Sequence, residues 1–365
     1  MSDAVGPVNI SEFETVARSR MDSAAYDYFA GAAGDERTLA DNRQAFDRIA
    51  FRPRVLVDVT RIDLTSTLLG IDLALPVLLA PTALNRLGHP DGELAAARAA
   101  RAAGTLMILS TTASSTIEDV AAACNGPLWF QLYVYRDREV TRDLIRRAEE
   151  AGCRAIVLTV DMPRMGRRER DLRNQFRLPE GISLRNLEVS GRADAGRWSA
   201  DSSFIEYVHS LLDPSLTWES IAWLRSITRL PVLLKGILSP GDAERAIEAG
   251  ASGIVVSNHG GRQLDGAIAT VAALPAIADR VAGRLPILLD GGVRRGTDVL
   301  KALAYGARAV LIGRPYLWGL AAAGEAGVSQ VLGLFRDELE LAMALAGCRT
   351  LAEVDRSIVC PVNQT

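Results

Sequence analysis

The segment Gly253-Ile254-Val255-Val256-Ser257-Asn258-His259-Gly260-Gly261-Arg262 (residues 253–262) decides the fold. Its four leading apolar residues do not alternate with polar ones, which is typical of a parallel strand buried on both faces. The chain has only three histidines, and His259 follows this strand, three residues before Arg262. That spacing suits a base and an anion clamp acting on one small molecule. Because a single histidine at a strand end is more often structural, its role depends on the rest of the chain.

Seven further apolar runs recur along the chain, and amphipathic stretches lie between several of them. The runs are 77–80, 106–109, 128–132, 155–160, 232–234, 287–289 and 309–312, and the helical stretches include 92–103, 139–151, 240–249 and 296–305. Eight strands that alternate with helices predict an α/β fold, a (β/α)₈ barrel. A doubly wound sheet is the alternative, but it needs a glycine fingerprint after its first strand. Pro81-Thr82-Ala83 stands there instead.

Two segments add to a minimal barrel. Residues 1–75 form an extension before the first strand, in which we expect helices at 11–20, 24–32 and 36–46. Residues 162–216 form a very long connection after the fourth strand, and 181–203 are rich in Gly, Ser, Asp and Arg. Loops of this length are usually lids or disordered segments. We therefore expect one barrel domain, 1–365, with a mobile lid followed by a helix near 218–227.

Composition narrows the class of protein. The chain has 365 residues, 48% of them hydrophobic, and a net charge of -3, which gives no reason to expect nucleic acid or an anionic membrane as partner. The four cysteines lack the spacing of a metal site or a disulfide framework, which favours a reducing compartment. We find no signal-peptide pattern, no apolar run of about 20 residues and no peroxisomal address at 362–365, so we expect a cytoplasmic enzyme that binds no membrane.

Polar residues follow every predicted strand, and the carboxyl ends of barrel strands meet on one face, where the active site lies. In chain order they include Pro81, Thr82 and Ala83; Ser110 and Thr112; Gln131 and Tyr133; Thr159 and Asp161; Lys235; Ser257 and His259; Asp290, Gly291, Gly292, Val293 and Arg294; and Gly313 and Arg314.

The last two strand ends offer backbone N–H groups and arginines where barrels commonly bind phosphate. The hydrogen-bonding groups of Ser110, Gln131 and Thr159 suit a flat heterocycle with amide-like edges. This set fits flavin mononucleotide (FMN). Lys235 has three open interpretations: a Schiff-base lysine, a structural ion pair, or a cation that faces a ligand gaining negative charge. The third would stabilise the anionic reduced flavin ring.

The chain resembles the FMN-dependent α-hydroxy acid oxidase and dehydrogenase family, from about residue 8 to about residue 356. The motifs that carry the resemblance are residues 26–29 (YDYF), 51–54 (FRPR), 80–83 (APTA), 130–133 (FQLY), 158–161 (LTVD), 166–168 (GRR), 257–265 (SNHGGRQLD) and 289–296 (LDGGVRRG). The pair formed by 257–265 and 290–296 is highly specific.

The resemblance implies a role for each site residue. His259 is the expected base, with Asp161 beside it, and Arg262 and Arg168 are expected to hold the substrate carboxylate, because planar forks fit a carboxylate well. Tyr28 and Tyr133 are expected to bind the carboxylate and hydroxyl. The catalytic set is completed by Lys235. The expected FMN contacts are Pro81, Thr82, Ala83, Ser110, Gln131, Tyr133, Thr159, Lys235, Ser257, Asp290, Gly291, Gly292, Val293, Arg294, Gly313 and Arg314.

The implied activity is oxidation of an (S)-2-hydroxy acid to a 2-oxo acid, with oxygen reduced to hydrogen peroxide. The chain departs from plant glycolate oxidase at Thr112, where that enzyme has a tryptophan. The expected substrate is therefore larger than glycolate or not restricted to it, such as lactate, a longer aliphatic acid or a mandelate. Ala83 matches the oxidases. The open alternatives are a dehydrogenase with another electron acceptor, a flavin-dependent barrel isomerase, and a flavin-binding protein without activity. The resemblance also suggests a homotetramer or octamer.

Overall fold

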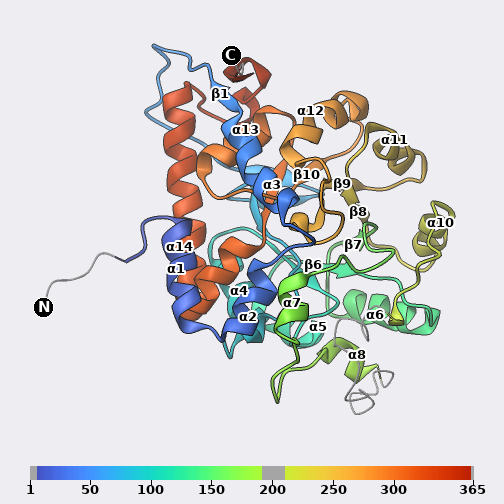
Figure 1. Cartoon of the computed structure of the whole chain (residues 1–365). Coiled ribbons are helices and arrows are strands. Elements are labelled where there is room, and N and C mark those ends of the chain that lie inside the picture. The colour runs from blue at the N-terminus through green and yellow to red at the C-terminus, as the bar shows by residue number, and fades with distance from the viewer. Residues whose placement is uncertain (1–5, 191–209, 363–365) are drawn as a thin grey trace, which may run out of the picture.

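The computed structural model describes residues 6–190 and 210–362, and its centre is a closed barrel of eight parallel strands (Figure 1). The order around the barrel is β10-β11-β4-β5-β6-β7-β8-β9. All eight predicted strands are confirmed, as is the barrel. They are β4 (Val77–Leu79), β5 (Met107–Ser110), β6 (Leu128–Leu132), β7 (Ile156–Thr159), β8 (Val232–Ile237), β9 (Gly253–Val256), β10 (Ile287–Leu289) and β11 (Ala309–Ile312).

β8 is the strand that departs most from its prediction. It continues through Lys235 and Gly236 to Ile237, whereas the sequence predicted an end at residue 234. Its pairing with β9 shifts register between Lys235 and Ile237. At the same place the backbone passes close to Asp161, since a Cβ on Gly236 would lie 2.6 Å from the Cβ of Asp161. Lys235 therefore projects from a strand rather than from a loop, on a rigid support.

Helices surround the barrel. The predicted ones are confirmed to within two residues: α4 (Gly92–Ala102), α6 (Arg138–Glu150), α10 (Glu219–Ser226), α11 (Pro240–Glu248) and α13 (Gly296–Ala304). The structure adds α5 (Ile117–Cys124), α12 (Thr270–Val281) and α14 (Arg314–Ala346), for which no range was predicted. The long α14 is interrupted at Ala323 and Gly324, where the backbone leaves helical geometry.

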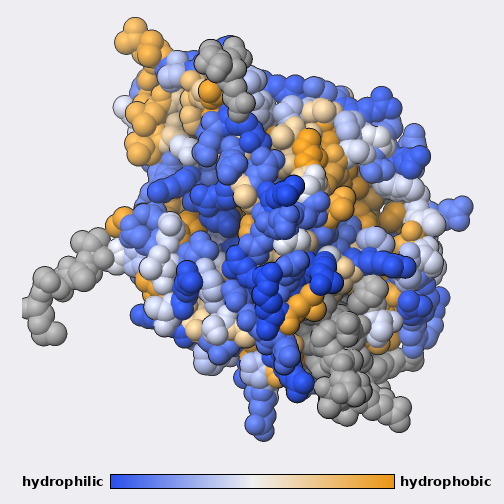
Figure 2. Space-filling view, viewed as in Figure 1, coloured by the Kyte–Doolittle hydropathy of each residue, from blue (hydrophilic) through white to orange (hydrophobic). Residues whose placement is uncertain are grey.

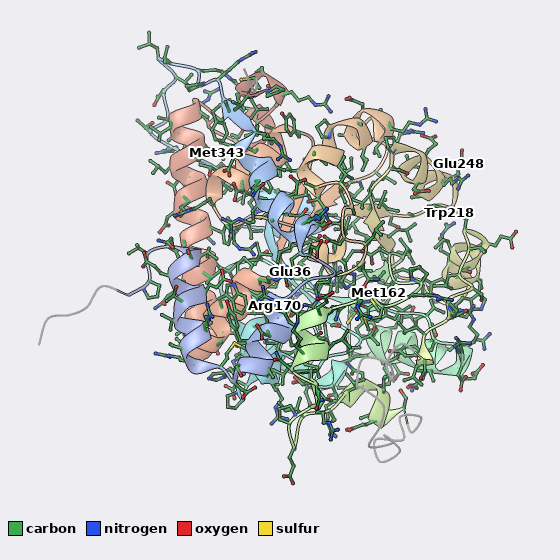
Figure 3. The ribbon with its side chains drawn as sticks, viewed as in Figure 1. Glu36, Met162, Arg170, Trp218, Glu248 and Met343 are labelled. Atoms are coloured by element: carbon green, nitrogen blue, oxygen red, sulfur yellow. The ribbon has the colours of Figure 1, made fainter. Side chains whose placement is uncertain are left out.

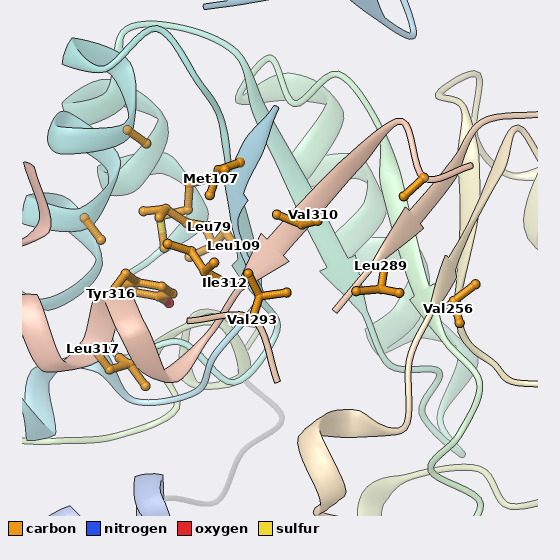
Figure 4. Close-up of a cluster of buried hydrophobic side chains, with 14 of the residues drawn as sticks. Leu79, Met107, Leu109, Val256, Leu289, Val293, Val310, Ile312, Tyr316 and Leu317 are labelled. Atoms are coloured by element: carbon orange, nitrogen blue, oxygen red, sulfur yellow. The ribbon is translucent and has the colours of Figure 1, made fainter. Parts of the chain in front are cut away.

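The apolar core has two layers. Side chains that point into the barrel form one cluster, and the hairpin of β2 (Ser66–Leu68) and β3 (Ile71–Leu73) packs its Leu68, Ile71 and Leu73 into it. The sequence did not predict this hairpin. The second layer lies between the strands and the outer helices and includes Tyr316 and Leu317 of α14 (Figure 4). Both layers hold the carboxyl ends of the strands in fixed positions.

The extension forms the three predicted helices α1 (Ile10–Arg20), α2 (Ser23–Ala30) and α3 (Arg37–Asp47). In Figure 1, α1 runs beside α14. After α3, the short strand β1 (Ile49–Phe51) pairs with β12 (Val359–Pro361) in an antiparallel sheet. This sheet joins the segment that follows the extension helices to the last described residues of the chain.

The described part of the long connection, residues 162–190 and 210–216, contains two short helices, α7 (Glu169–Arg173) and α8 (Arg185–Val189), that were not predicted. α8 is anchored, because Asn186 is fully buried and its Oδ1 accepts a hydrogen bond from the Ile117 amide at 2.9 Å. This corrects the view of 181–190 as loop. The rest of the predicted mobile lid, 191–209, lies outside the described residues.

The visible face of the molecule is mostly hydrophilic (Figure 2). Apolar atoms gather at the upper left, over the loop that follows β1. Val55 and Leu56 in that loop are exposed, and so are Leu341 and Leu345 on α14. Among residues 6–190 and 210–362, no helix is long and apolar enough to span a bilayer.

Candidate active site

An open cavity lies at the carboxyl ends of the barrel strands, with a volume of about 1220 Å³ that includes solvent space outside its mouth. Every predicted site residue lines it except Ser257 and Asp161. Those two support it from behind, because each contacts a residue of the cavity wall. The predicted residues in the wall are Tyr28, Pro81, Thr82, Ala83, Ser110, Thr112, Gln131, Tyr133, Thr159, Arg168, Lys235, His259, Arg262, Asp290, Gly291, Gly292, Val293, Arg294, Gly313 and Arg314.

His259 and Asp161 form a hydrogen-bonded pair. The distance from His259 Nδ1 to Asp161 Oδ1 is 2.9 Å. Burial is the largest single effect on the pKa of Asp161 and raises it, but His259, Lys235 and a backbone hydrogen bond together lower it below its ordinary value, so the carboxyl group is ionised. A carboxylate only accepts hydrogen bonds, so Nδ1 carries the proton. The other ring nitrogen, Nε2, is the one that can accept a proton from a ligand.

The pKa of His259 reflects two opposing effects. Burial is the larger effect and lowers the pKa of His259 below its ordinary value, while Asp161 offsets part of that shift and Lys235 and Arg168 add to it. The imidazole is therefore neutral near pH 7, as a base must be.

The turn that carries His259 has an unusual backbone. His259, Gly260 and Gly261 follow one another with φ of 57°, 64° and 78°, all left-handed. For a residue with a Cβ this conformation is disfavoured. Side chains hold the turn: Ser257 Oγ accepts from the His259 amide at 3.1 Å, and Asn258 Oδ1 accepts from the Gly261 amide at 3.2 Å.

Two guanidinium groups lie on the wall with His259. Arg262 donates through Nη1 to the carbonyl oxygens of Tyr28 at 2.6 Å and Gly31 at 2.9 Å, and its fork lies 5.1 Å from the centre of the Tyr28 ring. Arg168 is buried, and its Nε has no partner among the described residues. Burial and the neighbouring Arg262 lower the pKa of Arg168 to about 10, so it keeps its charge at neutral pH. A buried cation without a partner indicates a place for an anion.

The tyrosines come from different parts of the chain. Tyr28 belongs to α2, and Tyr133 follows β6. Burial raises the pKa of both, so both remain O–H donors. Phe176, which follows α7, stacks on the Tyr28 ring with centroids 4.6 Å apart. Sequence reasoning missed Phe176, because nothing in the sequence links it to a residue almost 150 positions away.

The connection that supplies Arg168 is anchored to the extension. Arg170 of α7 donates from Nη2 to Glu36 Oε2 at 2.6 Å and from Nη1 to Asp27 Oδ1 at 3.3 Å. Figure 3 shows Glu36 and Arg170 close to one another, with Met162 nearby. Met162 and Met165 also line the cavity and were not among the predicted site residues.

Lys235 is held between two polar partners. Its Nζ lies 2.8 Å from Asp290 Oδ2 and donates to Ser257 Oγ at 2.9 Å. Burial alone would lower its pKa, but Asp290 and Asp161 raise it above the ordinary value. An ammonium that stays protonated is a poor nucleophile, which disfavours the Schiff-base interpretation. Lys235 acts as a fixed cation at the cavity wall.

The wall fits FMN on its charge and its polar groups. It carries five basic side chains and one acidic one; the basic residues are Arg168, Lys235, Arg262, Arg294 and Arg314. Arg294 is only partly satisfied, since its Nε is buried without a partner among the described residues. Arg314 lies nearby and donates to the backbone oxygens of Phe29, Gly31 and Gly260. Opposite the arginines, Gln131 Nε2 donates to Thr159 Oγ1 at 2.9 Å. An anionic phosphate and an amide-edged ring would satisfy these groups.

The sequence pattern of the FMN-dependent dehydrogenases matches residues 17–361. The chain belongs to this family. It is 53% identical to glycolate oxidase of Spinacia oleracea over 351 residues, which cover 96% of this chain and 94% of the relative. It is also 46% identical to a mandelate oxidase solved with (S)-4-hydroxymandelic acid, with a TM-score of 0.92 over 97% of this chain and 99% of the other. A mandelate oxidase variant solved with (S)-mandelic acid gives 45% identity and a TM-score of 0.88, over 98% of this chain and 99% of the other.

These likenesses confirm the predicted family, the FMN cofactor and the 2-hydroxy acid oxidase activity of this FMN-dependent dehydrogenase. They also account for the barrel and its extension, because the matched regions span both. The isomerase and the inactive flavin-binding protein are no longer needed as explanations.

Proposed function

We propose that this enzyme oxidises an (S)-2-hydroxy acid larger than glycolate and returns the electrons to oxygen as hydrogen peroxide. The observation that carries the proposal is the His259–Asp161 pair, with 2.9 Å between Nδ1 and Oδ1, on a wall that also holds Arg168 and Arg262. One group that accepts a proton and two that bind a carboxylate thus share one cavity.

The arginines orient the substrate. Arg168 and Arg262 would hold the carboxylate with paired N–H donors, as planar forks do. Tyr28 and Tyr133 would donate to the carboxylate and the hydroxyl. Binding the carboxylate on one side and the hydroxyl on another leaves one face of the Cα carbon directed at the flavin, so the site selects one enantiomer. Such fixed orientation contributes much of the rate of an enzyme reaction.

His259 then takes a proton from the substrate at Nε2 and becomes an imidazolium. Asp161 stabilises the new charge through Nδ1 and keeps the ring in place. FMN, when bound, accepts the two electrons. Lys235, paired with Asp290 at 2.8 Å, supplies positive charge to the flavin site. The remaining FMN contacts are those predicted from the sequence, from Pro81 to Arg314.

The role of His259 is tested by His259→Gln. Gln is similar in size and can still donate and accept hydrogen bonds, but it cannot take the proton. We expect the variant to bind FMN and to lose turnover by about 10²- to 10⁴-fold, the usual contribution of a general base. FMN content by absorbance and turnover with a good substrate are measured together. A near-normal rate would remove His259 from the mechanism.

The size of the substrate pocket depends on Thr112. Its side chain is mostly buried and bonds to Ser110 at 2.9 Å, and Ala83, Met162 and Met165 line the same cavity. A small hydroxyl residue and flexible methionines leave room for an aliphatic or aromatic side chain. We expect Thr112→Trp to lower kcat/KM for mandelate and lactate-type acids more than for glycolate. A panel of 2-hydroxy acids, both enantiomers of each, measures this, and Thr112→Ser is the control that keeps the space open. Equal effects on all acids would show that Thr112 does not set specificity.

The electron acceptor is tested by comparing peroxide formation under air with reduction of a dye without oxygen. We expect oxygen to reoxidise the flavin at least as fast as the dye, in keeping with Ala83. A rate with the dye far above that with oxygen would favour the alternative, a dehydrogenase.

Assembly, domain organisation and location stay predictions. A homotetramer or octamer is supported by the exposed Val55, Leu56, Leu341 and Leu345, since apolar surface of this kind often lies at interfaces. Light scattering of the holoenzyme measures the assembly. We treat 1–365 as one functional unit because the extension supplies Tyr28. A cytoplasmic location is supported by free cysteines at positions 124, 153, 348 and 360.

A further inference from the structure

We propose that Asn42, on the extension helix α3, is a positioning residue for the reaction. It stabilises the left-handed turn that carries His259. It also sets the distance between that turn and the glycines that follow β10. The inference rests on the proposed function, because it assumes that His259 is the base. Nothing in the sequence motif of 257–265 points to a partner more than 200 residues earlier.

Asn42 and Asn258 form a reciprocal pair of amides. Asn42 Nδ2 donates to Asn258 Oδ1 at 2.9 Å, and Asn258 Nδ2 donates to Asn42 Oδ1 at 2.8 Å. Both side chains are buried, with exposed fractions of 1% and 4%. Two bonds between planar groups fix orientation as well as distance, and removing either partner leaves buried polar atoms unpaired.

The same Asn258 side chain stabilises the turn. Its Oδ1 accepts from the Gly261 amide at 3.2 Å, and its Nδ2 also donates to the Ile268 carbonyl oxygen at 3.1 Å. His259 lies inside this turn with φ of 57°. A non-glycine residue keeps such a conformation only when its surroundings enforce it. Asn42 therefore acts on His259 through Asn258, without touching it.

Asn42 also contacts the other half of the site. A Cβ on Gly292 would lie 1.9 Å from the Asn42 carbonyl oxygen, and one on Gly291 would lie 3.3 Å from Asn42 Nδ2. Its Oδ1 in addition accepts from the Thr270 amide at 3.3 Å. One residue of the extension thus touches the His259 turn and the glycines that we assign to the FMN phosphate. This sets the distance between the proton acceptor and the cofactor.

The reaction is sensitive to that distance, because a displacement of about 1 Å in a reacting group can cost about 10²-fold in rate. The test is Asn42→Ala in the full-length holoenzyme, with FMN at saturating concentration. We expect the rate of anaerobic flavin reduction by substrate to fall about tenfold or more. We expect the substrate dissociation constant to change much less, because Arg262 is held by the carbonyl oxygens of Tyr28 and Gly31 and Arg168 lies on a different segment of the chain.

The matched control is Thr38→Val, one turn earlier on α3. Thr38 is as buried as Asn42, and its Oγ1 accepts from the Gly266 amide at 2.8 Å, outside the turn. This variant should lower the melting temperature and leave the reduction rate nearly unchanged. If Asn42→Ala does not yield folded protein, Asn42→Asp serves, because it keeps the acceptor for Asn258 and Thr270 and should give a smaller loss of rate.

A double-mutant cycle separates positioning from general destabilisation. Asn42→Ala and Asn258→Ala should each slow reduction, and the double variant should be little slower than either, as expected for two residues that act as one unit. A normal reduction rate in FMN-saturated Asn42→Ala, or fully additive losses, would overturn the inference. His259→Gln is measured in parallel: a normal rate there contradicts the proposed function, whereas a normal rate only in Asn42→Ala contradicts this inference alone.

Discussion

His259 has to be buried, neutral and able to take a positive charge. Burial lowers its pKa, which keeps the imidazole neutral before the reaction, and Asp161 offsets part of that effect. The cost of charging the ring is thereby reduced where the charge forms. A histidine that was buried without a carboxylate partner would be a weaker base. A histidine with a carboxylate partner but without burial would already be protonated before the substrate reacts.

The pH dependence of kcat/KM follows from these directions. Protonated His259 cannot accept a proton, so the rate should fall as pH drops through its pKa, which lies below the ordinary value of about 6.5. In Asp161→Asn the attraction that raises the pKa is removed, so the acid limb should move to lower pH, and the maximal rate should fall by about 10²-fold or more. Initial rates in buffers of constant ionic strength measure both. An acid limb at the same pH in both proteins would show that it belongs to another group.

The site residues that could be predicted from sequence are those whose position in the fold follows from the residues next to them in the chain. His259, Arg262 and the glycines after β10 each follow a recognisable strand. Phe176 and Asn42 could not be predicted this way, because their roles depend on contacts with residues far along the chain. The lowered pKa of His259 could not be predicted, because its largest cause is burial and burial cannot be read from a motif.

Among the elements, the segment after β10 shows how closely the backbone is packed. Gly292 has φ of 83°, and a Cβ there would collide with the Asn42 carbonyl oxygen at 1.9 Å. Gly152, after α6, has the same φ of 83° with nothing within 4 Å of a Cβ. A substitution at Gly152 therefore tests the cost of the left-handed backbone alone, whereas one at Gly292 adds the cost of steric overlap.

We expect Gly152→Ala to cost about 1–2 kcal/mol of unfolding free energy, from the left-handed backbone alone. Gly292→Ala should cost more and should also weaken FMN binding, because Asn42 must move. Urea unfolding and FMN titration measure the two effects. Equal losses in both variants, with unchanged FMN affinity, would contradict the contact between Gly292 and the extension.

The barrel could be predicted because the pattern of an apolar run followed by an amphipathic helix occurs many times along the chain. A wrong boundary for one run would not have changed the predicted fold. The β2–β3 hairpin, α7 and α8 were missed because each is only three to five residues long. Such short elements owe their structure to what they pack against rather than to their own periodicity.

At the scale of the whole molecule, five basic residues on one cavity wall repel one another. FMN should therefore stabilise the fold, by about 2.7 kcal/mol at 100 times its dissociation constant. Riboflavin, which lacks the phosphate, should bind more weakly and so raise the melting temperature of the apoprotein less than FMN does at the same ligand concentration. In Arg294→Gln the difference between the two flavins should shrink. Thermal melts of the apoprotein with each flavin measure this, and an equal rise for both in the parent enzyme would place the phosphate elsewhere.

The pairing of β1 with β12 bears on how the protein is made. β1 leaves the ribosome early, but its partner is synthesised about 300 residues later. Tyr28 and Asn42 lie on the same extension, just before β1. The barrel strands can pair in order as they emerge, since domains form largely during synthesis. The extension can complete its packing only after β12 has been synthesised. The nascent chain thus completes its catalytic centre last, when little of the protein remains unfolded.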